Sequence, residues 1–287
     1  MFSKLAYLLP LGQILGKCPK MVLSLRYFKK FHRPLNRSNP QLFYDKIFWN
    51  SLNTDTTRWS ELADKYKVRA YVGERCGKDC LPNLLGVYEK PEDIDIDSLP
   101  NSFVVKTNNG CASNILIQDK QKVDRKDLCR KLGYWLRYPY GKLTGQQHYA
   151  KISPKVIVEE LLIQDGNEFT PLIDYKFYCF DGIPKYCMVM CDRVFNTHDF
   201  KFMMYDMEWN PLPEFFVSTQ RLKEAERPAC FDEMKCMAEK LSAGFNYVRV
   251  DLYSVKGKPV FGEMTFMPGY NVGFTLEAQA ILGGLMK

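Results

Sequence analysis

Val248–Asp251 (VRVD) and Phe261–Thr265 (FGEMT) are the two stretches that decide the fold, and Pro268 and Gly269 follow the second of them. The turn-forming residues Lys256–Pro259 (KGKP) lie between the two stretches. The pattern therefore predicts two neighbouring strands joined by a turn. Because side chains two residues apart on a strand face the same side, each strand presents a polar pair on one face.

The predicted strand pair brings polar side chains together. Arg249 and Asp251 share a face of the first strand, and Glu263 and Thr265 share a face of the second. If the strands pair, two carboxylates, a hydroxyl and a guanidinium converge. Hard oxygen ligands from few protein groups suit Mg²⁺, which keeps waters and usually bridges substrate phosphates. Since charged strand faces are common, an ordinary hairpin with outward charges remains open on this pattern alone.

Further segments along the chain point to a known family. They are Asp64–Arg69, Phe103–Lys106, Val158–Glu160, Asp174–Phe177, Tyr205-Asp206 and Arg249–Tyr253. Together with Arg-x-Asp, the hairpin, Glu-x-Thr and Pro-Gly, they resemble the TupA-like ATP-grasp family of bacterial surface-polysaccharide gene clusters, over about residues 35 to 275. The resemblance implies an α+β fold of the ATP-grasp type, with two α+β lobes and the nucleotide between them, preceded by a helical N-terminal segment.

The resemblance also divides the chain. We expect a helical, basic N-terminal segment over residues 1–58 and the N-terminal part of the ATP-grasp region over 59–100. The lid and hinge would cover 101–190, and the C-terminal lobe with the metal site 191–287. A length of 287 residues is enough for one large domain or two intimate lobes.

Composition and charge are those of an ordinary globular protein with a mild basic excess. The chain is 46% hydrophobic and 25% charged, and its net charge is +7. This excess favours anionic ligands such as nucleotides or uronic acids, or an anionic membrane face. No nucleic-acid-binding signature accompanies it. The ten cysteines are irregularly spaced, so we expect reduced, mostly buried thiols and neither a disulfide framework nor a zinc site.

The N-terminus allows two interpretations. Leu5–Leu15 is apolar but too short to span a bilayer, and no small-residue cleavage site follows it. Arg26–Arg33 (RYFKKFHR) mixes basic and aromatic residues and would suit peripheral contact with an anionic membrane. A docking helix with a solvated basic edge explains it equally simply, and we favour that. We expect a cytoplasmic protein, with the inner membrane face as the alternative location.

Periodicity and turn signals predict helices that alternate with antiparallel or mixed strands. Predicted helices cover residues 42–52, 59–76, 124–138 and 231–243, and predicted strands cover 103–106, 115–117 and 155–162. Residues 175–180 and 186–190 form a hairpin about Asp181-Gly182, a strong two-residue turn signal. Hairpins of this kind favour an α+β class over a parallel doubly wound sheet.

Residues for the nucleotide follow from the resemblance. Lys106 ends a strand before a loop of small residues, which in the family is a flap over the phosphates with the lysine on the nucleotide. Gly110 is the one glycine in this loop, where relatives often carry several, so the loop should be stiffer. Lys65 would reach toward the phosphates, with Arg69 one turn on. A surface hairpin and a solvated helix face are the alternatives for these cations.

The hinge would bind the adenine. The backbone of Leu161 and Leu162 would bond the edge of the ring, and either Glu159 or Glu160 would meet its exocyclic amine. The ribose needs a carboxylate slightly downstream. Asp174 fits the family's order, with Glu168 as its rival, and we favour Asp174.

Catalytic and metal residues complete the implied site. Lys176 shares the strand face of Asp174, and Arg193 follows the hairpin, so both are candidates for a phosphate or substrate. Many ATP-grasp ligases have a lysine shortly after this Tyr-Asp pair, but Met207–Trp209 follow Tyr205-Asp206 here, and Lys176, Arg193 or Lys201 would replace the lysine. Arg249 would lie beside the transferred phosphoryl or acyl-phosphate group. The implied Mg²⁺ ligands are Asp251, Glu263 and Thr265, with Thr265 where relatives commonly have an amide.

The implied function is an ATP- and Mg²⁺-dependent carboxylate–amine ligase. A carboxylate would attack the γ-phosphate of ATP, and an amine would displace phosphate from the resulting acyl-phosphate. The partners would be a small-molecule or glycan carboxylate and an amine, for example a sugar acid and an amino acid in surface polysaccharide biosynthesis, without nucleic acid. One alternative is a glycosyltransferase of capsular or surface polysaccharide synthesis, although Asp93–Asp97 (DIDID) resembles a linker more than its metal motif. Another is a non-catalytic nucleotide-binding protein, suggested by the sparse glycine loop and Thr265.

Overall fold

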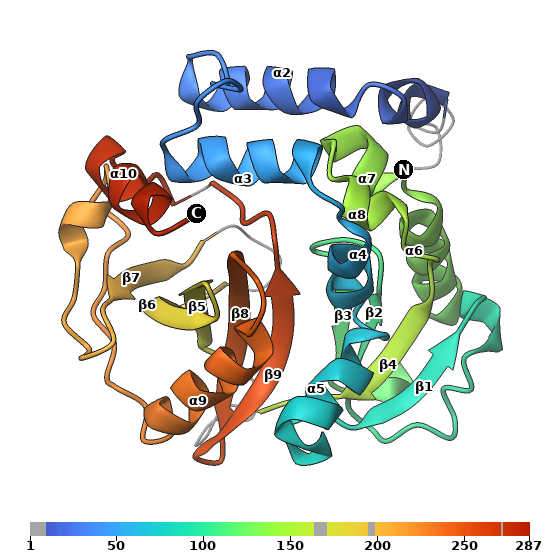
Figure 1. Cartoon of the computed structure of the whole chain (residues 1–287). Helices are drawn as coiled ribbons and strands as arrows, with labels where there is room; N and C mark the ends of the chain where they lie inside the picture. Colours follow the sequence, from blue (N-terminus) through green and yellow to red (C-terminus); the bar gives the residue numbers. More distant parts are fainter. Residues whose placement is uncertain (1–9, 164–170, 195–198, 271) are drawn as a thin grey trace. The chain divides into compact units, whose positions relative to one another are not determined.

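The computed structural model describes residues 10–163, 171–194, 199–270 and 272–287 (Figure 1). The chain divides into two compact units, each built from three separate pieces. Unit 1 contains Met1–Asn36, Asn50–Arg69 and Pro82–Leu161, and unit 2 contains Arg37–Trp49, Ala70–Leu81 and Leu162–Lys287. Each unit has its own antiparallel sheet with helices, which confirms the predicted α+β class.

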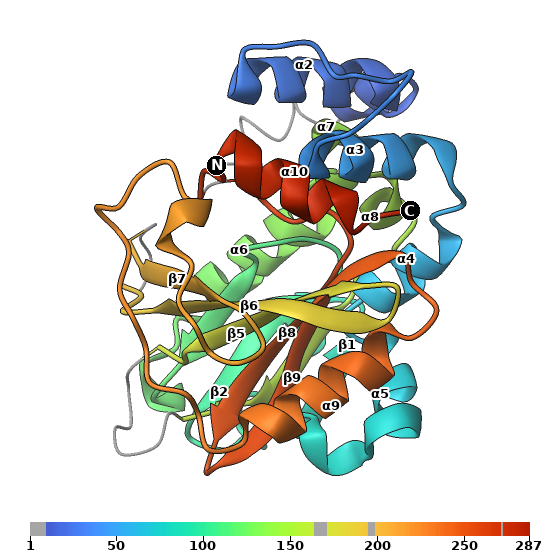
Figure 2. The same ribbon diagram turned by 60° about the vertical axis from the view of Figure 1, so that its left-hand side comes forward.

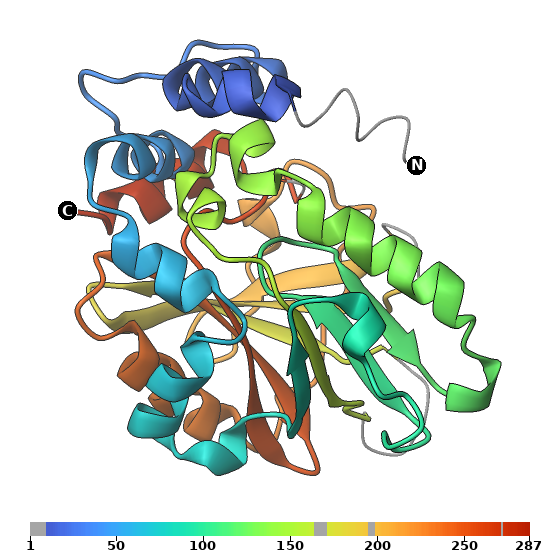
Figure 3. The same cartoon turned by 90° about the vertical axis from the view of Figure 1, so that its right-hand side faces the viewer.

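Unit 1 is built on a four-stranded sheet with the order β1-β4-β2-β3. Its strands are β1 (Leu84–Tyr88), β2 (Phe103–Thr107), β3 (Asn114–Ile117) and β4 (Val156–Glu160). Alternate residues of β2 and β4, such as Phe103 and Val158, are buried in a core shared with Leu132 of α6 (Arg125–Arg137), the green helix of Figure 3. The residues between them face the other side of the sheet, and this places Lys106 and Glu159 away from the core.

Residues 10–16 are helical, and five further helices of the described residues belong to the N-terminal region or to unit 1. They are α2 (Pro19–Phe31), α3 (Phe43–Asn53), α4 (Thr57–Ala63), α7 (Tyr140–Thr144) and α8 (Gln147–Ala150). Short 3-10 helices are η1 (Lys78–Cys80), η2 (Pro91–Asp93), η3 (Lys120–Lys122) and η4 (Pro213–Phe215). The N-terminal region is therefore helical, as predicted.

The single helix predicted over residues 59–76 is wrong. α4 ends at Ala63 and α5 (Val68–Cys76) begins five residues later. Asp64 between them is extended, and its carboxylate accepts hydrogen bonds from the backbone N–H groups of Tyr66 and Lys67. Aspartate competes in this way with helical backbone bonds, so the apolar periodicity continued past a residue that ends the helix.

Unit 2 is built on a five-stranded sheet with the order β7-β6-β5-β8-β9. The strands are β5 (Asp174–Phe180), β6 (Ile183–Cys191), β7 (Lys201–Tyr205), β8 (Tyr247–Val255) and β9 (Lys258–Thr265). Both predicted hairpins are confirmed. Asp181-Gly182 and Lys256-Gly257 form their two-residue turns with positive φ at both positions, as tight hairpin turns require.

Two different layers cover the faces of this sheet, with α9 (Phe231–Ser242) and α10 (Leu276–Gly284) on opposite sides (Figure 2). Phe177 of β5 stacks on Phe231 of α9, with ring centroids 5.6 Å apart. On the other face Tyr178 and Tyr247 pack around Phe43 of α3. Since alternate residues share a face, the odd-numbered residues of β8 and the even-numbered residues of β5 belong to this second face.

All ten cysteines are free. Only four of them are buried, namely Cys179, Cys187, Cys191 and Cys230, so the expectation of mostly buried thiols is wrong. Across the described part of the chain, no helix combines the length and apolar character needed to cross a bilayer.

Burial of His148 predicts a pH-dependent stability. The ring is 1% exposed, lies 4.4 Å from that of Tyr149, and its pKa is lowered by burial from 6.5 to about 3. Between those values the unfolded chain binds a proton that the folded chain does not. Stability is therefore complete above pH 6.5, and it falls by about 1.4 kcal/mol per pH unit as the pH drops below that value.

Urea unfolding of wild type and of His148→Phe at pH 7, 6 and 5 measures this effect. His148→Phe should lose the part of the pH dependence of the unfolding free energy that His148 contributes. His32→Gln, which changes an exposed histidine, should keep it. Equal slopes for wild type and His148→Phe would contradict the assignment.

Candidate functional site

Charged side chains gather in one cluster in each unit. In unit 1 the cluster centres on Lys106 and Glu159, which we call the lysine–glutamate cluster. In unit 2 it is a row of six alternating charges, which we call the ion-pair chain. Eight of the fourteen residues predicted for the site belong to one of the two.

Glu159 is held by two cations in the lysine–glutamate cluster. Lys106 Nζ lies 2.5 Å from Glu159 Oε2, and Arg69 Nη1 donates to Oε1 at 2.9 Å. Arg69 also donates to the carbonyl of Pro82 at 2.7 Å. Burial lowers the pKa of Lys106, and the charge of Glu159 works against that shift. Both oxygens of the only 5% exposed Glu159 carboxylate are thus committed to cations of the same unit.

Side chains hold the loop after β2. The side-chain nitrogen of Asn108 donates to Asp64 Oδ1 at 2.9 Å and to the carbonyl of Ser153 at 3.0 Å. Its side-chain oxygen accepts from the backbone N–H of Lys155. Lys65 Nζ donates to the carbonyl of Gly110 at 2.5 Å. The loop is therefore tied to the segment that follows α4, and Lys65 is one of its ties.

The space around residue 110 does not require a glycine. A Cβ at this position would meet its nearest neighbour, Tyr140, at 3.5 Å, which is ordinary van der Waals contact. The neighbouring Ala112 is the loop residue with positive φ, at 55°. Close approach of a ligand to the backbone of Gly110 stays a prediction.

The end of β4 carries the residues predicted for adenine. Glu160 accepts hydrogen bonds from the backbone and side-chain nitrogens of Asn83, both at 2.8 Å. Leu161 and Leu162 follow, both half-buried, and Leu162 is the first residue of the last piece of unit 2. Of the two glutamates, Glu160 is the more exposed, since Glu159 is enclosed by its cations. Their roles toward a nucleotide stay predictions, and Glu168, the rival for the ribose, lies outside the described residues.

The ion-pair chain lies on the face of the unit 2 sheet opposite α9. Its order is Arg193, Asp174, Lys176, Asp251, Arg249 and Glu263. The strand register explains it, because Lys176 lies directly opposite Asp251 on β8, and Asp251 lies opposite Glu263 on β9. Side chains directly opposite on antiparallel strands are near neighbours. The predicted convergence is therefore present, with three cations and three carboxylates in it.

Asp251 lies at the middle of the ion-pair chain. Its Oδ1 accepts from Arg249 Nε at 2.6 Å, and its Oδ2 accepts from Arg249 Nη2 at 2.7 Å and from Lys176 Nζ at 2.5 Å. The residue is 1% exposed, and burial alone would raise its pKa. Arg249 and Lys176 outweigh burial and lower the pKa below its ordinary value, so the carboxylate is ionised at neutral pH.

The two ends of the ion-pair chain are more open. Arg193 Nη2 lies 2.6 Å from Asp174 Oδ2, with its side chain 39% exposed. At the other end the Glu263 side chain is 35% exposed, and its Oε1 accepts from Thr265 Oγ1 at 3.2 Å. Thr265 Oγ1 in turn accepts from Arg249 Nη2 at 3.1 Å. Ligands from solvent therefore reach Arg193 and Glu263, at the ends of the ion-pair chain, more readily than its centre.

The three predicted metal ligands fit a hard cation in their chemistry, since Asp251, Glu263 and Thr265 offer only oxygen donors. Glu263 is the accessible member, and its Oε2 has no partner among the described residues. Asp251 already accepts three hydrogen bonds from Lys176 and Arg249, two of them at Oδ2, so Oδ1 is its less engaged oxygen. Within the described ranges, no three or more His, Cys, Asp or Glu side chains are grouped to hold a metal.

Sequence reasoning missed the residues that anchor the site residues. Asn108 and Asn83 hold the loop and Glu160, and Lys176 pairs with Asp251 although it had been assigned to a phosphate. An Asn directly after a strand is a weak turn signal and does not reveal its distant partners. The pairing of Lys176 becomes visible only once β5 is known to lie beside β8.

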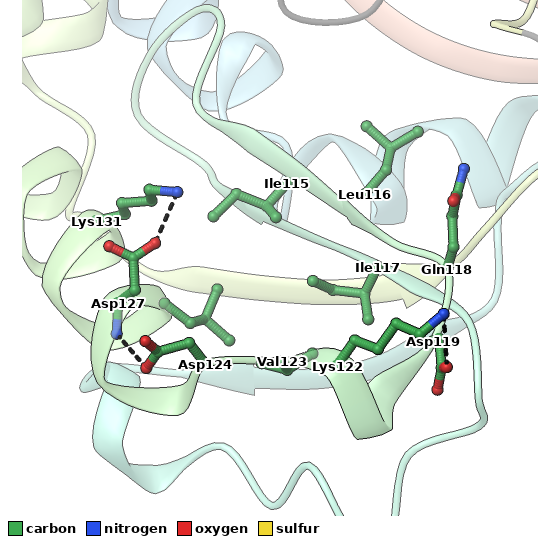
Figure 4. A pocket seen from close by; sticks show the side chains of 11 residues that line it. Ile115, Leu116, Ile117, Gln118, Asp119, Lys122, Val123, Asp124, Asp127 and Lys131 are labelled. Atoms are coloured by element: carbon green, nitrogen blue, oxygen red, sulfur yellow. Dashed lines mark hydrogen bonds and ion pairs between the residues drawn. The ribbon is translucent and has the colours of Figure 1, made fainter.

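A hollow of about 390 Å³ in unit 1 contains none of the predicted site residues (Figure 4). Its acidic side chains already have local partners. Asp124 caps α6 by accepting from the backbone N–H of Asp127, and Asp127 pairs with Lys131 at 2.7 Å. Asp124 and Asp127 thus stabilise α6.

Removal of the central carboxylate should unfold unit 2 more readily. Asp251→Asn leaves Arg249 and Lys176 buried without their shared counter-charge, and breaking a buried ion pair in this way costs about 3–5 kcal/mol. Glu263→Gln, at the exposed end of the ion-pair chain, is the matched control, because an exposed ion pair contributes at most about 1 kcal/mol to stability. Urea unfolding without nucleotide or divalent cation measures both. A loss below about 1 kcal/mol for Asp251→Asn would show that Arg249 and Lys176 do not depend on it.

Comparison with known proteins places the chain in a family. Residues 45–287 match the family model described as TupA-like ATPgrasp. No curated protein matches the chain. Similar solved structures include the ATP-grasp ligase PsnB complexed with a minimal precursor, with a TM-score of 0.44, 15% identity, and coverage of 84% of this chain and 66% of that one.

Two further ligase structures are also similar. D-alanine–D-alanine ligase from Bacillus anthracis complexed with ATP has a TM-score of 0.45 and 14% identity, and covers 80% of this chain and 62% of its own. Phosphoribosylamine–glycine ligase from Thermotoga maritima has a TM-score of 0.42 and 13% identity. The match covers 72% of this chain and 49% of the ligase. The chain spans less than two thirds of the length of each of these three proteins. Because the family model covers residues 45–287, the chain belongs to the TupA-like ATP-grasp family.

Proposed function

We propose that the protein is an ATP- and Mg²⁺-dependent carboxylate–amine ligase that acts through an acyl-phosphate. The ion-pair chain is the observation that carries this proposal. It gathers Lys176, Arg193 and Arg249 with three carboxylates on one sheet face, in a chain that belongs to an ATP-grasp family. Phosphoryl transfer needs fixed positive charge and little covalent chemistry from the protein, which this arrangement suits.

Arg249 is the best-oriented cation of the site. Asp251 accepts from both Nε and Nη2 of Arg249, so the planar guanidinium is fixed before any substrate arrives. A fixed donor stabilises charge that develops in the transition state without reorganising. We therefore assign Arg249 to the transferred phosphoryl group, and Lys176 and Arg193 to phosphate or substrate oxygens.

The remaining site residues follow the family's order. Lys106 and Lys65 would bind phosphates, Glu159 or Glu160 with the backbone of Leu161 and Leu162 would recognise adenine, and Asp174 would accept from the ribose. The pairing of Glu159 with Lys106 and Arg69 favours Glu160 for the adenine amine. Glu263, Asp251 and Thr265 would hold Mg²⁺, which when bound screens the charge of the phosphates.

Lys176 links the metal ligand Asp251 and the phosphates in this proposal. Its ammonium now bonds Asp174 at 3.2 Å and Asp251 at 2.5 Å. When Lys176 turns toward a phosphate oxygen, Asp251 Oδ2 loses one of its two donors and gains capacity for another cation. The same movement therefore serves both the phosphate and the metal ligand.

The reaction proceeds in two displacements. A substrate carboxylate oxygen attacks the γ-phosphorus, the bond to ADP breaks, and an acyl-phosphate forms. The amine nitrogen then attacks the acyl carbon, phosphate leaves, and the nitrogen loses a proton to give the amide. The family's setting suggests a sugar acid and an amino acid or similar amine, in the cytoplasmic assembly of surface polysaccharide.

A non-catalytic nucleotide-binding protein is the second candidate, because both oxygens of Asp251 are occupied by Arg249 and Lys176. A glycosyltransferase has no comparable support from the family match. The Asp93–Asp97 segment begins in a 3-10 helix, buries Ile94 and Ile96, and pairs Asp97 with Arg125, so its residues serve packing.

Hydroxylamine trapping tests the ligase directly. The protein is incubated with ATP, Mg²⁺ and a panel of uronic acids and amino acids, with hydroxylamine as the amine. A ligase yields ADP, phosphate and a hydroxamate from the accepted carboxylate. Nucleotide binding without turnover supports the second candidate, and release of UDP or GDP from a nucleotide sugar would replace both.

Glu263→Gln should lower turnover by roughly 10²–10³, the usual effect of losing one electrostatic contact in an active site. Its fold should remain intact, because the Glu263 side chain is 35% exposed and its pair with Arg249 is long, at 3.5 Å. Glu239→Gln, an exposed change on α9, is the matched control and should keep full turnover. Steady-state ADP release at varied Mg²⁺ and a melting curve decide the outcome. Wild-type turnover by Glu263→Gln would remove this residue from the site.

A further inference from the structure

The excess of positive over negative charge lies in the N-terminal segment of the chain. Residues 1–44 contain eight Lys or Arg and no Asp or Glu. The remaining residues contain 32 basic and 33 acidic side chains, so they carry a net charge of −1. The family match begins at residue 45, and the basic segment thus lies outside the matched region. The net charge of +7 comes from a part of the chain that the family does not account for.

The same segment exposes large apolar side chains. On α2, Met21, Leu25 and Phe28 are 48%, 62% and 55% exposed. Their i, i+4, i+7 spacing places them on one face of the helix, which we call the apolar stripe. Just before α2, Leu11 and Ile14 in the helical residues 10–16 are 43% and 64% exposed. Exposed apolar side chains are common singly, but a row along one helix indicates an interaction surface.

The opposite face of α2 is anchored within unit 1. Leu23 and Tyr27 are fully buried there. Leu23 packs so closely on Gly145 that a Cβ at that glycine would lie 2.7 Å from its Cγ. Arg26 Nη1 donates to the carbonyl of Thr144, at the end of α7, at 2.5 Å. These contacts fix the rotation of α2, and the apolar stripe consequently faces away from α7.

Cations lie along both edges of the apolar stripe. At 100° per residue, Lys20 and Lys29 fall on opposite sides of it, and Lys17 precedes the helix. Lys17, Lys20, Lys29 and Lys30 are all exposed. An apolar row bordered by lysines, with no acidic residue nearby in sequence, is typical of helices that lie in the interface of a lipid bilayer.

We propose that α2 docks on a membrane surface rich in anionic phospholipid. The apolar stripe would enter the boundary between headgroups and acyl chains, and the flanking lysines would meet the lipid phosphates. Charge selects this occupant. In a second copy of the chain the lysines would meet a like-charged segment and a remainder with a net charge of −1. The sugar-phosphate backbone of a nucleic acid has no place for an apolar row. This proposal does not depend on the ligase activity.

Vesicle co-sedimentation of the full chain tests the docking. Phosphatidylcholine vesicles with 25% phosphatidylglycerol are compared with pure phosphatidylcholine, at 50 and 500 mM salt. We expect binding to the anionic vesicles at low salt, strongly reduced at high salt, and little on the neutral ones. Absence of binding to anionic vesicles, or equal binding to both, would overturn the proposal.

Charge variants separate specific from general attraction. Lys17→Gln with Lys29→Gln should weaken vesicle binding by about fivefold for each charge removed. Lys185→Gln with Lys258→Gln removes two exposed lysines from unit 2 and should leave binding unchanged. Equal loss in both double variants would mean that α2 is not the contact.

Apolar variants separate the membrane from a protein partner. Leu25→Ser with Phe28→Ser should weaken binding at least tenfold, whereas Val217→Ser with Leu276→Ser, at side chains 73% and 61% exposed, should not. Light scattering gives the oligomeric state of each protein, and melting curves confirm that each variant folds. A wild-type dimer that becomes monomeric in the first variant, without vesicle binding, would assign the stripe to a second copy instead.

Discussion

Asp251 accepts hydrogen bonds from Arg249 and Lys176 in the interior of unit 2, and the geometry of the site follows from this arrangement. The two cations are themselves almost fully buried, and Asp251 is the counter-charge that they share. The carboxylate in turn stays ionised only because the cations overcome its burial. Each of these charges is therefore a condition for the others. This mutual dependence explains how polar side chains occupy a sheet face that continues into the aromatic cluster around Phe43.

A balanced set of charges also limits which ligands can bind. Three cations and three carboxylates leave the ion-pair chain neutral, so a lone phosphate or a lone divalent cation would upset the balance. A nucleotide bound together with its metal adds both signs at once. The exposed ends at Arg193 and Glu263 then offer one position for each sign. In the proposed ligase, phosphates and metal would accordingly bind together, each improving the site for the other.

The sequence was sufficient where local rules decide structure. Strand alternation placed Arg249 and Asp251 on one face, and the residues Asp181-Gly182 marked their hairpin correctly. It failed where a single polar group changed the local outcome, as when Asp64 ended α4 and interrupted an otherwise regular apolar period. Periodicity measures the average of a window and cannot detect one side chain that captures backbone N–H groups.

Partners from distant strands were beyond sequence reasoning for a different reason. Glu159 meets Lys106 because β4 lies beside β2, and Lys176 meets Asp251 because β5 lies beside β8. The choice of neighbouring strand depends on the whole sheet and leaves no mark in the residues themselves. The ligand roles given to Glu159 and Asp251 did not anticipate that cations of their own unit would already surround them.

The division of each unit into three pieces has a consequence for biosynthesis. Unit 1 has all of its residues once Leu161 has been made, so it can fold while the rest of the chain is still being synthesised. Unit 2 contains Arg37–Trp49 and Ala70–Leu81 but receives its strands only from residue 162 onward. Its early helical residues, Phe43 among them, must wait for more than a hundred residues before their core exists. During that interval their apolar surface is open to misfolding or to a chaperone.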